Sequence, residues 1–167
     1  MTALRITING RSYGPLEVRE DLTLNDFLRE YLGLTGTKFG CGAAQCLCCA
    51  VIVDNPDGTS HASPSCAVSA ASFDGKTIRT VEGHAKEGEL SALQKAFIEH
   101  FAFQCGYCTP GFIMTVKSLL AENPDPSQDD IRAALSGNLC RCTGYNQMYE
   151  AIRAAIKAEQ EATAQAR

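Results

Sequence analysis

The spacing of the cysteines constrains this chain more than any other feature of its sequence. The chain has 167 residues and nine cysteines, and four of these cysteines fall in the stretch CGAAQCLCC. Three of the four are spaced C-x4-C-x2-C, and a further cysteine follows at a distance: Cys41, Cys46, Cys49 and Cys66. The fold must therefore bend one tight loop and bring a remote segment to the same place. This spacing leaves Cys48 outside the set.

A C-x4-C-x2-C loop with a distant fourth cysteine is typical of a plant-type [2Fe–2S] site. Glycines at 36, 40 and 42 favour this interpretation. Backbone N–H groups can approach sulfur more closely where no side chain intervenes. Structural zinc is the alternative, but zinc sites usually combine two short cysteine pairs. The spacing therefore favours the iron–sulfur cluster over zinc.

The remaining four cysteines form a second set in the C-terminal half. QCGYCTPG contains Cys105 and Cys108, and GNLCRCTG contains Cys140 and Cys142. Each pair precedes an expected helix, whose N-terminal N–H groups and dipole favour a negatively charged thiolate cluster. A thioredoxin-like C-x2-C or a zinc site is the alternative, although the redox motif requires a βαβ pattern that this half lacks. Two sets of four account for every cysteine except Cys48.

Composition and charge restrict the class of protein. Hydrophobic residues make up 45% of the chain and charged residues 20%, as in a folded globular protein. The net charge of −4 argues against nucleic-acid binding, and no apolar run is long enough for direct membrane insertion. The N-terminal sequence has no signal-peptide core. We therefore expect a cytoplasmic protein, unless a partner with a signal carries it out, and cysteines that bind metal instead of forming disulfides.

The first half has the pattern of a small α+β domain. Apolar and polar residues alternate over 4–8, which indicates a half-buried strand, and Asn9-Gly10 then predicts a hairpin turn. Further strands are expected at 16–18, 50–53 and 77–81, and a helix is expected over 24–31. Strands crossed by one helix predict an α+β fold.

The second half has helical periodicity. Helices are expected at 90–101, 109–123, 127–137 and 145–158, and the last residues should fray. The polar stretch 82–89 separates the two halves. We therefore expect a first domain at 1–81, a helical domain at 82–160 and a frayed tail at 161–167. Because domains this small have modest cores, metal ligation would help to stabilise each of them.

No motif for substrate chemistry accompanies the cysteines. Gly36-Thr37-Lys38 lacks the upstream glycine of a phosphate-binding loop, and neither a dinucleotide fingerprint nor a nucleophile elbow occurs. The histidines at 61, 84 and 100 lie in unlike contexts, so we assign no catalytic residue. Two electron-carrying sites without a substrate site indicate a chain that transfers electrons.

Three motifs resemble those of the small iron–sulfur subunit of the molybdenum hydroxylases, the xanthine oxidase family: TGTKFGCGAAQC, FQCGYCTPGFIM and LSGNLCRCTGY. The resemblance covers about residues 3–158. It implies an N-terminal β-grasp domain of the ferredoxin type and a C-terminal four-helix bundle, each with one [2Fe–2S] cluster. It assigns the first cysteine set, Cys41, Cys46, Cys49 and Cys66, to an outer cluster. It assigns the second set, Cys105, Cys108, Cys140 and Cys142, to an inner cluster.

The resemblance also implies partners for this chain. In the family, a large subunit holds a molybdopterin cofactor and hydroxylates the substrate, and electrons leave through the inner and then the outer cluster. The electrons commonly reach FAD on a third subunit, so we expect a heterotrimer. Gln104 and Cys142 occupy the positions that contact the pterin in relatives. This chain would then be a non-catalytic subunit of an oxidoreductase.

The first cysteine loop departs from the common family pattern C-G-x-G-x-C-G-A-C-T. Ala44 and Leu47 replace glycines, Cys48 replaces alanine and Ala50 replaces threonine. Every expected ligand remains, but a glycine at position 47 serves a positive φ or close packing. The A-A-Q variant is similar to members that oxidise N-heteroaromatic compounds, some with a cytochrome acceptor instead of FAD. Aldehydes, purines and CO are the other substrate classes.

A function from another class is a free-standing electron carrier or a metal-stabilised binding module. The helical half argues against it, because a ferredoxin does not need a second domain of this kind.

Overall fold

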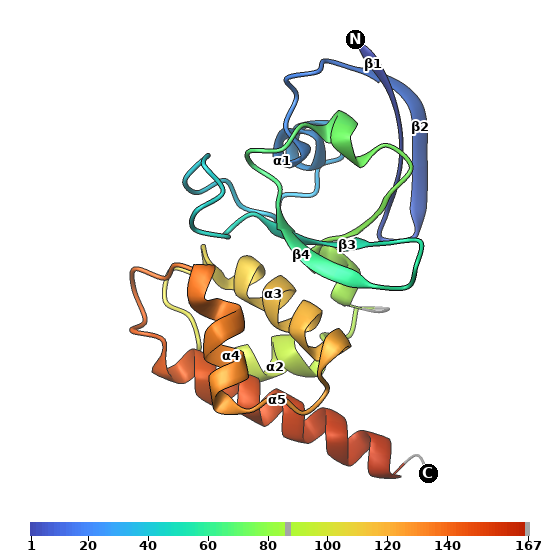
Figure 1. Ribbon diagram of the computed structural model, residues 1–167. Helices are drawn as coiled ribbons and strands as arrows, with labels where there is room; N and C mark the ends of the chain where they lie inside the picture. Colours follow the sequence, from blue (N-terminus) through green and yellow to red (C-terminus); the bar gives the residue numbers. More distant parts are fainter. Residues whose placement is uncertain (86–87, 166–167) are drawn as a thin grey trace.

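The computed structural model describes residues 1–85 and 88–165, in which a sheet-containing half and a helical half lie in contact (Figure 1). The first half contains a five-stranded mixed sheet in the order β2-β1-β5-β3-β4. The strands are β1 (Thr2–Ile8), β2 (Arg11–Val18), β3 (Ala50–Asp54), β4 (Ser60–Pro64) and β5 (Thr77–Arg79). β1 and β5 run parallel, whereas the other neighbours pair antiparallel. The expected α+β class is confirmed.

The β1–β2 hairpin forms where the sequence predicts it. Asn9 and Gly10 have φ values of 50° and 81°, which is the backbone geometry of a type I′ turn. The expected helix at 24–31 divides into a short α-helix, α1 (Leu24–Asp26), and a π-helical segment, η1 (Phe27–Tyr31). The hydroxyl of Thr23 caps this helix by accepting a hydrogen bond from the backbone N–H of Asp26 at 3.1 Å.

Strand β4 and two short 3₁₀ segments were not expected from the sequence. β4 is built from SHASP, which has neither apolar alternation nor strong β-propensity. It forms because it is the edge partner of the buried strand β3, to which the turn at 55–58 connects it. The 3₁₀ segments are η2 (Ala70–Phe73) and η3 (Val81–His84), and η3 begins where strand β5 had been expected to continue.

The helical half contains α2 (Ala92–Glu99), α3 (Thr109–Glu122), α4 (Gln128–Ala134) with the 3₁₀ turn η4 (Leu135–Gly137), and α5 (Asn146–Gln165). Capping boxes begin α2 and α4, at Ser91 and Ser127. Cys108 stands at the N-cap of α3, where Thr109 had been expected. No helix in the described part of the chain combines the length and apolar character needed to cross a bilayer.

Helix α5 is longer than the sequence pattern predicts. Residues 159–165 were expected to fray, but they continue the helix, while 166–167 lie outside the described residues. The stretch is rich in alanine, glutamate and glutamine, which favour helix formation. Two side-chain contacts also hold it: Glu159 pairs with Lys117 on α3, and Gln160 Nε2 donates to Asp125 Oδ1 at 2.9 Å.

Helix α3 joins the two halves. It packs against β3 and β4, and Met114 is fully buried with Ala50 and Ile52 of the sheet (Figure 1). The approach is closest at Gly111, where an added Cβ would lie 2.0 Å from the Leu47 carbonyl oxygen. Only glycine permits this contact, so Gly111 determines how closely the first cysteine loop can approach α3.

Replacing Gly111 with alanine should therefore weaken the contact between the halves. The free energy of unfolding should fall by about 2–3 kcal/mol, because the new Cβ forces backbone to move in a packed region. Urea unfolding measures this change. Gly58→Ala is the control, since Gly58 has open space around it and only a positive φ, which costs about 1 kcal/mol for alanine. Equal losses in the two variants would contradict the close contact.

Candidate metal centres

The first cysteine loop lies between η1 and β3, on the side of the molecule where the two halves meet (Figure 1). Cys41 is exposed, and its Sγ accepts hydrogen bonds from the backbone N–H groups of Ala43 and Gln45, both at 3.3 Å. These N–H groups, with that of Cys46, lower the pKa of Cys41 to about 6. A loop that directs several amides at one sulfur is suited to a thiolate that binds metal.

The loop has a left-handed backbone at both positions where the common family pattern has glycine and this chain does not. Ala44 has φ 57° and Leu47 has φ 52°, values that cost a non-glycine residue on the order of 1 kcal/mol each. Contacts with the helical half hold Leu47 in this conformation. Its carbonyl oxygen lies against Gly111, and its side chain lies against Gly137. Leucine at this position therefore preserves the backbone geometry of the loop and adds an apolar contact.

The first set of thiols is arranged as two neighbouring pairs. Cys46 lies near enough to Cys41 to lower its pKa, and Cys49 lies near enough to Cys66 to raise its pKa, while Cys46 is also a neighbour of Cys48. Cys46, Cys49 and Cys66 are buried. Burial, together with Cys49 beside it, raises the pKa of Cys66 to about 11.

The second set has the same arrangement. Cys142 Sγ lies 3.6 Å from Cys105 Sγ, and this pair is exposed. Cys108 and Cys140 form a buried pair, in which burial and the neighbouring Cys140 raise the pKa of Cys108 to about 12. Burial acts to raise the pKa of Cys140 as well, yet hydrogen bonds from the hydroxyl and N–H of Thr143 hold it below the ordinary value.

This donor arrangement fits a two-iron cluster. Each set supplies four thiols as two pairs, and a [2Fe–2S] cluster takes four cysteine ligands. Two thiolates on one tetrahedral metal with bonds of about 2.3 Å are separated by about 3.8 Å, close to the 3.6 Å between Cys105 and Cys142. Within the described residues, no three His, Cys, Asp or Glu side chains are grouped as ligands of one metal ion. All nine cysteines carry free thiols.

One cavity of about 300 Å³ is bordered by all four cysteines of the second set and by two of the first set, Cys41 and Cys46. It is lined by Gly40, Cys41, Cys46, Cys48, Cys105, Tyr107, Cys108, Leu139, Cys140, Arg141 and Cys142. Two hydrogen bonds connect its walls across the two halves. Leu139 N donates to the Cys46 carbonyl oxygen at 3.1 Å, and the Tyr107 hydroxyl donates to the Phe39 carbonyl oxygen at 2.6 Å. The structure therefore brings the two sets together at the junction of the halves.

Cys48 is a neighbour of Cys46 in the first set and shares a buried core with two cysteines of the second. It is 7% exposed and packs in the same core as Cys108 and Cys140. Burial, followed by its hydrogen bond with Cys46, raises its pKa to about 12. Since burial raises the pKa of Cys66 and Cys108 to a similar extent, spacing, not acidity, distinguishes Cys48 from the expected ligands.

The two residues expected to contact a pterin are both at the surface. Gln104 and Cys142 are exposed, and Gln104 directly precedes the exposed Cys105. Sequence reasoning missed the contacts made by main-chain atoms, such as that between Leu139 and Cys46, which leave no side-chain signal. It also missed the role of Gly111, although a glycine near the start of a helical pattern is a signal for close approach.

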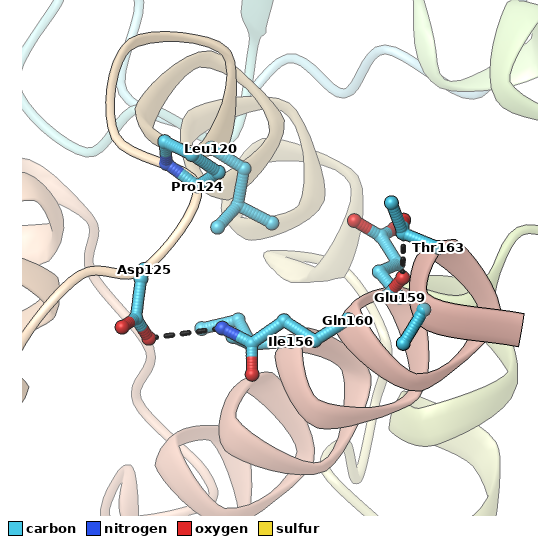
Figure 2. A pocket seen from close by; sticks show the side chains of 8 residues that line it. Leu120, Pro124, Asp125, Ile156, Glu159, Gln160 and Thr163 are labelled. Atoms are coloured by element: carbon cyan, nitrogen blue, oxygen red, sulfur yellow. Dashed lines mark hydrogen bonds between the residues drawn. The ribbon is translucent and has the colours of Figure 1, made fainter. Parts of the chain in front are cut away.

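A second hollow, of about 480 Å³, lies far from the cysteines between the ends of α3 and α5 (Figure 2). Its polar side chains are partnered with neighbours: Gln160 donates to Asp125, and the Thr163 hydroxyl donates to the Glu159 carbonyl oxygen at 2.8 Å. Leu120, Pro124 and Ile156 form its apolar wall. It joins no group of nucleophiles or metal ligands, so the cysteine-lined cavity is the candidate centre.

Comparisons with known proteins agree with this geometry. Residues 6–77 match a family model described as a 2Fe-2S iron-sulfur cluster binding domain, and residues 80–153 match one described as a [2Fe-2S] binding domain. The chain is 46% identical over 158 residues to the nicotinate dehydrogenase small FeS subunit of Eubacterium barkeri, covering 92% of this chain and 96% of that subunit.

Solved structures show the same relationship. A chain of quinoline 2-oxidoreductase from Pseudomonas putida 86 superposes with a TM-score of 0.83 at 42% identity, covering 95% of both chains. The aldehyde oxidoreductase of Desulfovibrio gigas superposes with a TM-score of 0.87 at 39% identity, covering 96% of this chain but 17% of that longer one.

The chain therefore belongs to the iron–sulfur subunits and domains of the molybdenum hydroxylase family. It has two 2Fe-2S domains, and it is an electron-transfer part of an oxidoreductase.

We predict that Cys48→Ala retains the iron of both centres and that Cys49→Ala loses iron from the first. Cys49 completes the C-x4-C-x2-C spacing and pairs with Cys66, whereas alanine at 48 removes little volume and no expected ligand. Loss of ligation should also destabilise the first half, because metal binding is coupled to folding. Iron content and visible absorbance of both variants measure the outcome. Iron loss in Cys48→Ala with retention in Cys49→Ala would reverse the assignment.

Proposed function

We propose that this chain relays electrons from a molybdopterin centre in a large partner subunit to FAD in a third subunit or to an external acceptor. The chain itself is non-catalytic. The cavity supports this proposal most directly, because Cys41 and Cys46 of the first set line it together with all four cysteines of the second set, so the two electron-carrying sites would be close together. When bound, two [2Fe–2S] clusters supply sites that take up and release single electrons.

We assign the ligands by pairing and spacing. Cys41, Cys46, Cys49 and Cys66 hold the outer cluster, and Cys105, Cys108, Cys140 and Cys142 hold the inner one. The first domain would be a β-grasp at 1–81, which the mixed sheet and its single crossing helix support. The second would be a four-helix bundle at 82–160, which α2, α3, α4 and α5 support.

The residues between the two sets can couple them. Cys46 of the outer set and Cys140 of the inner set are joined by main chain and one hydrogen bond, from Leu139 N to the Cys46 carbonyl oxygen. Cys46, Cys108 and Cys140 pack in the same buried core. Burial excludes water from this region, and hydrogen bonding and solvent exposure both act on cluster potentials.

The large partner subunit would bind on the side of the molecule where Cys105 and Cys142 are exposed. Gln104 and Cys142 would contact the pterin there. Large side chains with apolar surface are also exposed beside this pair, namely Leu139 at 58% and Tyr107 at 47%. Exposed apolar groups on this scale are typical of surfaces that another protein covers. With a flavin subunit the complex would be a cytoplasmic heterotrimer.

The names of relatives bear on the substrate of the complex. Nicotinate dehydrogenase, nicotine 6-hydroxylase and quinoline 2-oxidoreductase are named for N-heteroaromatic compounds. Other relatives are named as a xanthine dehydrogenase subunit and an aldehyde oxidoreductase. Together with the A-A-Q loop, the first group favours an N-heteroaromatic substrate for the partner subunit, over an aldehyde, a purine or CO.

The reduced protein should show two distinguishable EPR signals and about four iron atoms per chain. The two sites differ in burial and hydrogen bonding, so their signals should differ in shape and potential. EPR-monitored reduction together with iron analysis measures both quantities. A single signal, or zinc in place of iron, would contradict the proposal.

We expect Cys142→Ser and Cys66→Ser to affect different steps in the complex with the partner. Cys142→Ser should slow delivery of the first electron to the inner cluster, because Cys142 is both an inner ligand and a pterin contact. Cys66→Ser should leave that delivery intact and impair transfer to the acceptor. Stopped-flow reduction of each variant separates the steps. Equal loss of inner-cluster reduction would contradict the order inner then outer.

A further inference from the structure

A network of buried polar groups connects helix α1 to the segments that carry Cys49 and Cys66. Asn25 on α1 and Ser65, the residue before Cys66, are both 0% exposed. The helical residues around Asn25 are fully buried leucine and phenylalanine side chains. A buried amide is unfavourable in such surroundings unless hydrogen bonds compensate for its lost hydration. The hydrogen bonds of Asn25 must therefore compensate for the burial of its amide.

The side-chain amide of Asn25 reaches two other segments of the chain. Its Nδ2 donates to Ser65 Oγ at 3.2 Å and to the Lys38 carbonyl oxygen at 3.5 Å. Ser65 Oγ in turn donates to the Cys49 carbonyl oxygen at 2.7 Å. Main-chain bonds run in parallel, because Asn25 N donates to Ser65 O at 3.0 Å and Ser65 N donates to Cys49 O at 3.3 Å.

These bonds join the three segments that carry the outer ligands. Lys38 lies three residues before Cys41, Ser65 lies next to Cys66, and Cys49 takes part directly. The segments are far apart in sequence, yet their sulfurs must meet around one cluster. Asn25 Oδ1 has no partner among the described residues, so the amide does not recover its full hydrogen bonding. The two bonds that Nδ2 donates are therefore what the amide contributes at this buried position.

We infer that Asn25 is a positioning residue of the outer cluster, holding the main chain of Cys49 and Cys66 in register with the segment that leads to Cys41. The inference rests on the proposed function, from which it takes the ligand set. The hydrogen bonds of Asn25 go to main chain and to Ser65, so it acts through the ligand segments and not on sulfur.

Asn25→Leu in the full chain with both clusters tests this inference. Leucine has as many side-chain heavy atoms as asparagine, and it removes the amide bonds while the main-chain bond from Asn25 N to Ser65 O remains. We expect an iron chelator to bleach the outer cluster roughly threefold to tenfold faster, as for the loss of about one net hydrogen bond. The outer EPR signal and its midpoint potential should also shift. The inner-cluster signal, in the same molecule, should stay unchanged and reports that the chain is folded.

Two further variants sharpen the test. Ser65→Ala should act in the same direction, and Asn25→Leu with Ser65→Ala should be less than additive, because the residues belong to one network. Thr37→Val is the matched control. It removes a hydroxyl that is 1% exposed, has no partner among the described residues and lies in the same loop segment. Its outer cluster should behave as in the wild type.

The outcomes separate the inference from the proposed function. If Asn25→Leu behaves like Thr37→Val, or if both clusters change together, Asn25 is not a positioning residue of the outer cluster. If the wild type itself has no separate outer signal that Cys66→Ser removes, the ligand assignment fails, and the inference fails with it. A change confined to the outer cluster in Asn25→Leu and Ser65→Ala supports the inference.

Discussion

The contact between the Leu47 carbonyl oxygen and Gly111 sets the relation between the two halves of the molecule. A Cβ at Gly111 would lie 2.0 Å from that oxygen, so any other residue would push α3 and the loop apart. The Leu139–Cys46 hydrogen bond, at 3.1 Å, forms beside this contact. Electron transfer between two sites requires them to be close. The contact between Gly111 and Leu47 therefore bears on both cysteine sets, because it keeps the two halves close together.

Two kinds of interaction determine the shape of the first cysteine loop. Left-handed residues such as Ala44 turn the chain so that amides face Cys41, and the helical half contacts the left-handed Leu47 further along the loop. The hydrogen bonds of Asn25 and Ser65 hold together the segments that carry the cysteines of the first set. Burial raises the pKa of the Cys66 thiol, which the network holds beside the loop, so this thiol gives up its proton when metal binds, not before.

Cysteine spacing predicts which thiols belong to one set, because ligand geometry restricts the sequence directly. It does not predict how the two sets meet, since that depends on main-chain contacts at Gly111 and Leu139 that any side-chain pattern would allow. Periodicity likewise predicts the helices and the buried strands. It fails for β4, an edge strand that its partner specifies, and for the end of α5, where tertiary contacts of Glu159 and Gln160 extend the helix.

The two cysteine sets differ in how many of their thiols are exposed, and this difference bears on the direction of electron transfer. The inner set has one exposed pair, Cys105 and Cys142, and one buried pair, whereas in the outer set Cys41 alone is exposed. Solvent exposure and hydrogen bonds to sulfur are among the properties that set cluster potentials. Under the proposed function, two clusters of the same chemical type would therefore differ in potential. The exposed inner pair would be where a partner's cofactor reaches sulfur directly, and the buried thiols of the inner set would keep water away from the path to the outer set.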